Sequence, residues 1–93
     1  MSTTEFRLDR IAYVLERRGC EKSKHYSDIQ RHLFTPPVRV GRASAWPRHE
    51  TEALIRAHIA GATDEQLRTL VSQLVGQRAE LMPSIQATQS ESH

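Results

Sequence analysis

The sequence predicts a single, mainly α-helical domain that carries a small two-stranded β-hairpin. Apolar residues recur at helical spacing in four separate segments, whereas a short stretch after two consecutive prolines alternates between apolar and basic residues. A length of 93 residues is enough for one domain only, and a domain of this size buries roughly 60 to 65% of the surface of its unfolded chain. We therefore expect a small core and no elaborate enzyme pocket.

The positive charge of the chain is concentrated in its middle. The formal net charge is only +2, from 13 Lys and Arg against 11 Asp and Glu. Residues 17–48, however, hold eight Lys and Arg against two Asp and Glu, a net charge of +6, whereas residues 1–16 sum to −1 and residues 49–93 to −3. A concentrated basic segment in a small domain is typical of a protein that binds a polyanion, usually nucleic acid. The alternative is a solvated basic face without a partner.

The composition disfavours several other function classes. No stretch approaches the roughly 20 apolar residues of a membrane span, and residues 1–10 carry charge where a signal peptide would be apolar, so we expect a cytoplasmic protein that binds no membrane. Cys20 is the single cysteine, which excludes an internal disulfide and a cysteine-rich zinc site, and the histidines show no metal-ligand spacing. No nucleophile and base recur at a catalytic spacing. We expect no enzyme, no metal or other cofactor and no small-molecule substrate.

The first helix is predicted from about residue 10 to residue 18. Its apolar face consists of Ile11, Val14 and Leu15. Asp9 is a candidate N-cap and Gly19 a candidate C-terminal stop. At its end, Arg17 and Arg18 either contact phosphate or form a solvated helix terminus, and the pattern leaves both options open.

A second helix is predicted over residues 21–32. One stripe along it carries His25, Ile29 and Leu33, with Tyr26 beside the stripe. We expect His25 to be a buried, hydrogen-bonded histidine, and Cys20, in the turn before the helix, to pack in the core. The opposite side presents short polar and cationic side chains, namely Ser23, Lys24, Ser27, Gln30 and Arg31. Two short helices joined at a glycine form a helix-turn-helix pattern.

A β-hairpin, or wing, is predicted after the second helix. Pro36 and Pro37 cannot continue a helix, residues 38–40 alternate between apolar and basic, and residues 41–42 supply a turn. Residues 43–46 then return towards Pro47. We expect Arg42 at the tip, and we expect Trp46 to anchor the hairpin on the helices, because an isolated hairpin is unstable in water.

Two C-terminal helices complete the predicted domain. The first begins near Arg48, places Ala53, Leu54, Ala57 and Ile59 near one face, and ends at Gly61. Thr63 and Gln66 form a capping box for the second. Its apolar stripe consists of Leu67, Leu70, Val71, Leu74 and Val75. We expect this stripe to pack on the rest of the domain, since a small core needs the extra apolar area; the alternative is a homodimer through the same stripe.

The second helix and the wing are the candidate DNA-binding site. The major groove of B-form DNA admits one helix, which must combine an exposed polar and cationic face with an apolar face that fixes it to the domain. The residues expected to contact base edges or phosphates from the helix are Lys22, Ser23, Lys24, Tyr26, Ser27, Gln30 and Arg31. From the wing, Arg39 and Arg42 would reach the backbone or an adjacent minor groove.

Three blocks of the sequence resemble the AlpA family of prophage regulators. They are Gly-Cys-Glu-Lys-Ser-Lys-His-Tyr at 19–26, Leu-Phe-Thr-Pro-Pro-Val-Arg-Val-Gly at 33–41 and Arg-Ala-Ser-Ala-Trp-Pro at 42–47. Members of this family are small winged helix-turn-helix proteins, similar to the DNA-binding domain of MerR regulators and to phage excisionases. The resemblance covers residues 7–80 and is most specific from Phe34 to Trp46. Three positions depart from the family pattern: Glu21 replaces a Ser N-cap, Ser27 replaces a frequent basic residue, and His32 replaces a common helix-ending glycine.

The resemblance implies a regulator of transcription linked to a prophage or integrative element. It adds Ser44 to the expected wing contacts and supports those of Arg39, Arg42 and the second helix. The expected organisation is a flexible N-terminus (1–6), a winged helix-turn-helix domain (7–60), an amphipathic helix (61–82) and a disordered tail (83–93). Two alternatives remain, an excisionase that bends attachment-site DNA and a protein-interaction adaptor that acts through the C-terminal helix.

Overall fold

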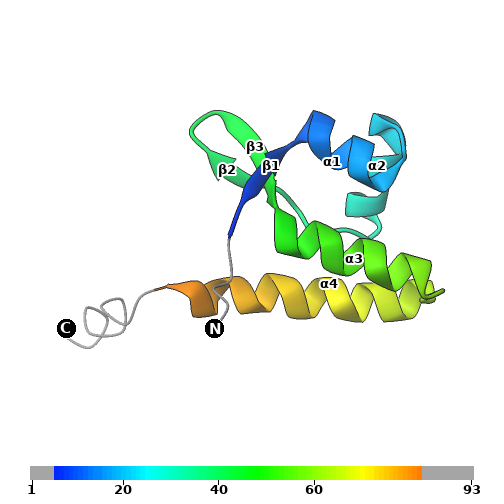
Figure 1. Cartoon of the computed structure of the whole chain (residues 1–93). Helices are drawn as coiled ribbons and strands as arrows, with labels where there is room; N and C mark the ends of the chain where they lie inside the picture. Colours follow the sequence, from blue (N-terminus) through cyan, green and yellow to red (C-terminus); the bar gives the residue numbers. More distant parts are fainter. Residues whose placement is uncertain (1–5, 83–93) are drawn as a thin grey trace, which may run out of the picture.

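The structure, a computed structural model, describes residues 6–82 of the chain and is mainly helical with a small antiparallel sheet (Figure 1). In chain order its elements are β1 (Leu8–Arg10), α1 (Ile11–Arg18), α2 (Lys22–Gln30), β2 (Val38–Val40), β3 (Ala43–Pro47), α3 (Arg48–Ile59), α4 (Asp64–Arg78) and a short 3-10 helix, η1 (Ala79–Leu81). All four predicted helices are present. No helix within the described residues is both long and apolar enough to cross a membrane.

The sheet has three strands rather than the two that the sequence predicts. Its order is β1-β3-β2, and β1 pairs with β3 in antiparallel register, with Leu8 opposite Pro47 and Arg10 opposite Ala45. The sequence gives no sign of β1, because three residues are too few to show an alternating pattern. β1 forms because its backbone pairs with the edge of β3.

Asp9 is not the N-cap of α1, which corrects the sequence-based prediction. The N-cap is Arg10, and it forms no side-chain capping bond. As the middle residue of β1, Asp9 lies opposite Trp46, and its carboxylate accepts two hydrogen bonds of 3.0 Å from the Arg48 guanidinium. Strand pairing thus turns this side chain towards the interior, where Arg48 balances its charge.

The turn between α1 and α2 follows the prediction. Gly19 adopts the left-handed conformation with φ 68°, and its N–H donates to the Leu15 carbonyl at 2.8 Å. At the end of α2, His32 adopts φ 63°, a region that favours glycine.

The predicted hairpin is formed by β2 and β3, with Val38 opposite Ala45 and Val40 opposite Ala43. Its base is held by Trp46, whose side chain is fully buried and whose indole Nε1 donates to the Thr35 carbonyl at 3.0 Å. The prediction that Trp46 anchors the hairpin is therefore confirmed.

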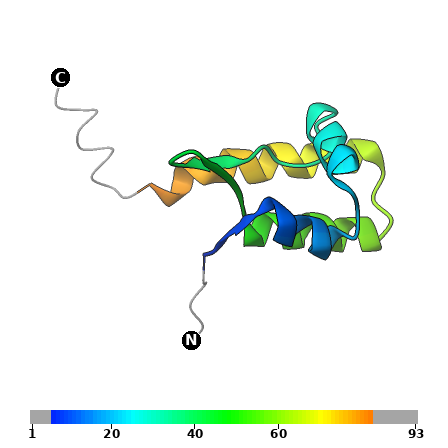
Figure 2. The ribbon, with the colours of Figure 1, turned by 90° about the horizontal axis from the view of Figure 1, so that it is seen from above.

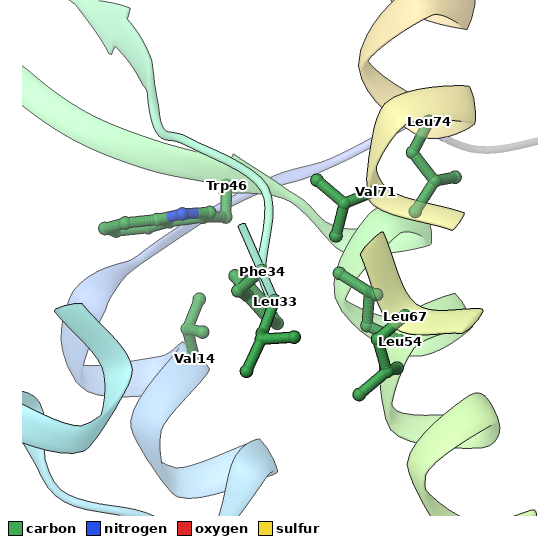
Figure 3. Packing of buried hydrophobic residues seen from close by; sticks show 8 residues of the cluster. All are labelled: Val14, Leu33, Phe34, Trp46, Leu54, Leu67, Val71 and Leu74. Atoms are coloured by element: carbon green, nitrogen blue, oxygen red, sulfur yellow. The ribbon is translucent and has the colours of Figure 1, made fainter. Parts of the chain in front are cut away.

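One hydrophobic core joins the helices and the sheet (Figure 3). It consists of Val14, Leu33, Phe34, Trp46, Leu54, Leu67, Val71 and Leu74. In Figure 3, Leu33 and Phe34 lie between the side chains of α1 and the sheet on one side and those of α3 and α4 on the other. Ile59 was expected on the buried face of α3, but it lies at the last residue of that helix and is 79% exposed.

The α4 helix packs against α3 and contributes to the same core (Figures 1 and 2). Its predicted capping box is present, with the Gln66 N–H donating to Thr63 Oγ1 at 3.1 Å and the Thr63 N–H to Gln66 Oε1 at 2.9 Å. In the stripe, Leu67, Val71 and Leu74 are buried, and Leu70 and Val75 pack against the core while partly exposed. The prediction that the stripe packs on the rest of the domain is confirmed. A homodimer through the same stripe would have to expose side chains that the chain already buries.

A buried ion pair fixes the far end of α4. Glu50 on α3 has no solvent exposure, and Arg78 donates to both of its carboxylate oxygens, at 2.8 and 2.7 Å. Arg78 also donates to the Pro36 carbonyl at 2.8 Å. Residues 7–60 and 61–82 therefore share one core and this ion pair. The predicted disordered tail, and residues 1–5 of the predicted flexible N-terminus, lie outside the described residues.

Candidate nucleic-acid interface

The α2 helix separates its side chains into a buried and an exposed face. His25 and Asp28 are buried and Ile29 is half-buried, all on one side. The exposed residues are Lys22, Ser23, Lys24, Tyr26, Ser27 and Gln30, followed by Arg31 at the C-cap. At about 100° per residue, Ser23, Ser27 and Gln30 form the middle of the exposed face. The sequence-predicted face of the helix is therefore confirmed as solvent-exposed.

His25 is packed among aromatic rings, as predicted. Its ring is fully buried, and its centroid lies 4.9 Å from that of Phe34 and 4.8 Å from that of Trp46. Nδ1 is 2.8 Å from Arg18 Nη1. Burial, together with the positive charge of Arg18, lowers the pKa of His25 from 6.5 to about 4. The ring is neutral at pH 7, and a neutral Nδ1 accepts the hydrogen bond from Arg18.

Asp28 is a buried carboxylate that the sequence analysis did not single out. It accepts hydrogen bonds from Arg18 Nη2 at 2.7 Å and from Lys24 Nζ at 3.0 Å. Burial acts to raise the pKa of Asp28, but the hydrogen bonds from Arg18 and Lys24 outweigh it, and the pKa lies below its ordinary value. The sequence could have indicated this burial, because Asp28 is an acidic residue that lies between His25 and Ile29 of the predicted apolar stripe.

Arg18 is neither a free phosphate contact nor a solvated helix end, the two options that the sequence left open. It bonds both His25 and Asp28, and its guanidinium lies over the Phe34 ring, 4.3 Å from the centroid. Arg17 is exposed but paired with Glu52 at 2.8 Å. Arg18 therefore connects α1 to α2 and determines how the second helix sits on the first.

The β2–β3 hairpin extends the surface that begins at α2. Arg39 lies opposite Ser44 in the sheet, and both share the face that carries Trp46, because side chains alternate along a strand. Trp46 in turn meets Tyr26, with 6.2 Å between the ring centroids. The hairpin face with Arg39 and Ser44 is thus the one against which α2 packs, and Gly41 and Arg42 form its exposed turn.

Lys24 and Arg31 lie on the other flank of α2. Lys24 is paired with Asp28, and Arg31 lies 3.4 Å from Asp64 at the start of α4, while its carbonyl accepts a hydrogen bond from Arg68. Both line an open cavity of about 530 Å³ between the α1–α2 turn and the ends of α3 and α4. The structure does not bring these two cations together with those of the hairpin.

Ion pairing divides the eight cations of residues 17–48 into two groups. Five of them pair with carboxylates, namely Arg17, Arg18, Lys24, Arg31 and Arg48. Among the residues that the structure describes, Lys22, Arg39 and Arg42 have no carboxylate partner. The cations without a carboxylate partner therefore lie at the start of α2 and on the hairpin.

The N-terminus of α2 adds backbone donors to these cations. Its N-cap, Glu21, forms no side-chain capping bond, so the first N–H groups of the helix are not used by a capping side chain. Glu21 itself is exposed. Helix N-termini with free N–H groups favour phosphate oxygens.

The remaining sequence candidates have mainly structural roles. Cys20 is a free, half-buried thiol outside the hydrophobic core, so its predicted core packing is only partial. Within residues 6–82, no three His, Cys, Asp or Glu side chains gather in a group that could hold a metal ion.

A comparison with known protein families, curated proteins and solved structures finds no match to this chain.

Proposed function

We propose that the chain is a winged helix-turn-helix protein that binds double-stranded DNA sequence-specifically and regulates transcription, as an AlpA-type regulator does. The observation that carries the proposal is the position of the three cations without carboxylate partners. Lys22 begins α2, whose exposed face carries short polar side chains, and Arg39 and Arg42 lie on the hairpin. This combination suits a groove flanked by phosphates.

In this proposal α2 enters the major groove. Ser23 and Gln30 lie in the middle of its exposed face, and a glutamine amide can pair with both the N6 and the N7 groups of adenine. Tyr26, at the edge of that face, is held by ring contacts with His25 and Trp46, so its hydroxyl is fixed for donation to a phosphate. Base contacts would come from the middle of the face and phosphate contacts from its edges.

The hairpin would contact the DNA backbone next to the groove that α2 occupies. Arg42 lies in its exposed turn, and the Arg39 guanidinium contacts the Arg42 carbonyl at 3.4 Å. Lys24 and Arg31 contribute less in this arrangement than the sequence suggests, because Lys24 shares the Asp28 carboxylate with Arg18 and Arg31 pairs with Asp64.

The structure disfavours one of the two alternative functions, the adaptor, and does not distinguish the other, the excisionase, from the proposal. An adaptor that acts through the apolar face of the C-terminal helix is disfavoured, because Leu67, Val71 and Leu74 are buried in the core. An excisionase would use the same surface as a regulator. The two differ in whether deletion of the gene alters excision of the element or only transcript levels, so that measurement separates them.

The salt dependence of binding tests the proposal. The logarithm of the affinity for a labelled DNA duplex should fall linearly with the logarithm of the salt concentration, because each phosphate contact releases counterions. Changing Lys22, Arg39 or Arg42 to Ala should each reduce the slope by about 1. Arg56→Ala is the matched control, since Arg56 is exposed on α3 and away from this surface. A slope near zero, or equal effects of all four changes, would contradict the proposal.

Sequence specificity is tested separately. Selection of bound duplexes from random DNA should yield a defined site for the natural chain. Gln30→Ala should relax the preference at one position of that site at a cost of about 1 to 3 kcal/mol, whereas Arg42→Ala should weaken binding evenly across sequences. A selected pool without a preferred sequence would limit the function to nonspecific binding.

A further inference from the structure

β1 is an edge strand whose outer side is open. The sheet order is β1-β3-β2, and no element of residues 6–82 pairs with the outer side of β1. In Figure 2 the strand lies at the margin of the fold. Edge strands carry backbone N–H and C=O groups that another strand can use.

The backbone groups of Leu8 point to this open side. Leu8 lies opposite Pro47, which has no N–H. The preceding pair is hydrogen-bonded, since the Arg48 N–H donates to the Arg7 carbonyl at 2.7 Å. Hydrogen-bonded and non-hydrogen-bonded pairs alternate in an antiparallel ladder, so Leu8 occupies a non-hydrogen-bonded site. Its N–H and C=O are therefore directed away from β3.

An apolar trough lies beside the same edge. It has a volume of about 430 Å³, and its walls include Phe6, Leu8, Val38, Pro47 and Leu81. Phe6, Leu8, Leu81 and the adjacent Met82 are 49 to 56% exposed, and they are four of the eight large apolar side chains exposed in the described chain. Apolar side chains that gather in this way beside an open strand edge mark a contact surface.

We propose that this surface binds a second copy of the chain by antiparallel pairing of two β1 strands centred on Leu8. Leu8 and Arg10 share one side of β1, and Phe6 precedes Leu8 by two residues. Pairing centred on Leu8 sets this leucine against the partner's Leu8, and Phe6 against the partner's Arg10, an attractive arrangement of a cation and an aromatic ring. Pairing centred on Arg10 would instead oppose two cations. Charge therefore favours the register centred on Leu8 over the one centred on Arg10.

The size of the contact fits a weak dimer. Burial of the four exposed apolar side chains and the strand edge on both protomers would approach the ~1,000 Å² at which specific interfaces begin. The contact is made by the same patch on each protomer, so it closes after two copies. We therefore expect a reversible dimer whose population rises with the protein concentration.

Analytical ultracentrifugation of the full chain over a concentration series, without DNA, tests the dimer. We expect a monomer–dimer equilibrium that Leu8→Lys weakens at least ~10-fold, because two lysines would then face each other. Ile59→Lys is the matched control, since Ile59 is equally apolar and 79% exposed but lies on α3. A purely monomeric natural chain, or equal effects of the two changes, would overturn the proposal. Removal of residues 84–93 should leave the equilibrium unchanged; loss of the dimer would show that this segment, and not β1, joins the two chains.

Disulfide formation tests the register in a Cys20→Ser background. Leu8→Cys should cross-link two chains on mild oxidation, since directly opposed residues lie at disulfide distance. Arg10→Cys should cross-link far more slowly, because the two positions would lie ~13 Å apart along the strands. Faster cross-linking at Arg10 would overturn the register. Because no DNA is present in either experiment, neither result depends on the proposed function.

Discussion

Arg18 Nη2 donates a 2.7 Å hydrogen bond to Asp28 Oδ2 and thereby ties α1 to α2. The exposed fractions of the two side chains are only 16% and 3%. The same guanidinium contacts His25 and covers the ring of Phe34. The orientation of the proposed DNA-reading helix thus depends on one arginine from the preceding helix.

Arg18→Gln should destabilise the fold by ~3 kcal/mol, because it leaves the Asp28 carboxylate buried with Lys24 as its remaining cationic partner. Arg17→Gln is the control, since the Arg17–Glu52 pair is largely exposed and should contribute at most ~1 kcal/mol. Urea unfolding of both variants measures the difference. Equal losses would show that the Arg18 contacts do not determine stability.

The free energy of unfolding should fall as the pH is lowered from about 6.5 towards 4. His25 takes up a proton in the unfolded chain near pH 6.5 but in the folded chain only near pH 4, so acid favours unfolding across this interval. The loss from this residue amounts to at most ~3 kcal/mol. The lowered pKa of Asp28 adds a further loss below its ordinary value of 3.8.

Replacement of His25 tests whether this residue causes the pH dependence of the unfolding free energy. His25→Gln keeps an acceptor for Arg18 but removes the titrating ring, so its unfolding free energy should vary much less between pH 6.5 and 4.5. His58→Gln, at an exposed position on α3, should retain the full pH dependence. If both variants keep it, another group is responsible.

Arg78→Gln should cost ~3 to 5 kcal/mol, because Glu50 is completely buried and loses the cation that binds both of its oxygens. The double variant with Glu50→Gln should lose less than the sum of the two single changes, since the uncompensated charge is then removed. Thermal and urea unfolding of the single and double variants give this coupling. Strict additivity would mean that the pair contributes little.

Removal of residues 64–93 should unfold the domain instead of leaving a DNA-binding unit, because α4 supplies Leu67, Val71 and Leu74 to the core. Within the full chain, Leu74→Ala should cost ~2 to 5 kcal/mol, whereas the exposed Gln73→Ala should change stability by less than ~0.5 kcal/mol. A truncated chain with a cooperative unfolding transition would contradict this expectation.

The sequence by itself determined the helices, the hairpin, the capping box at Thr63 and the exposed side of α2. These features follow from local rules, because apolar spacing, proline and capping residues act within a few positions of the chain. It also located the basic segment. Most of the residues in the candidate DNA interface could therefore be named before their positions were known.

Only the tertiary structure decided which of those cationic residues have no carboxylate partner. The pairs Arg18–Asp28, Arg31–Asp64 and Arg48–Asp9 join residues 10, 33 and 39 positions apart, and no local pattern specifies such partners. The β1 strand likewise exists only because β3 lies beside it. Five of the eight cations in the basic segment pair with four carboxylates, Asp28 being shared by Arg18 and Lys24, and this leaves Lys22, Arg39 and Arg42 without a carboxylate partner among the described residues.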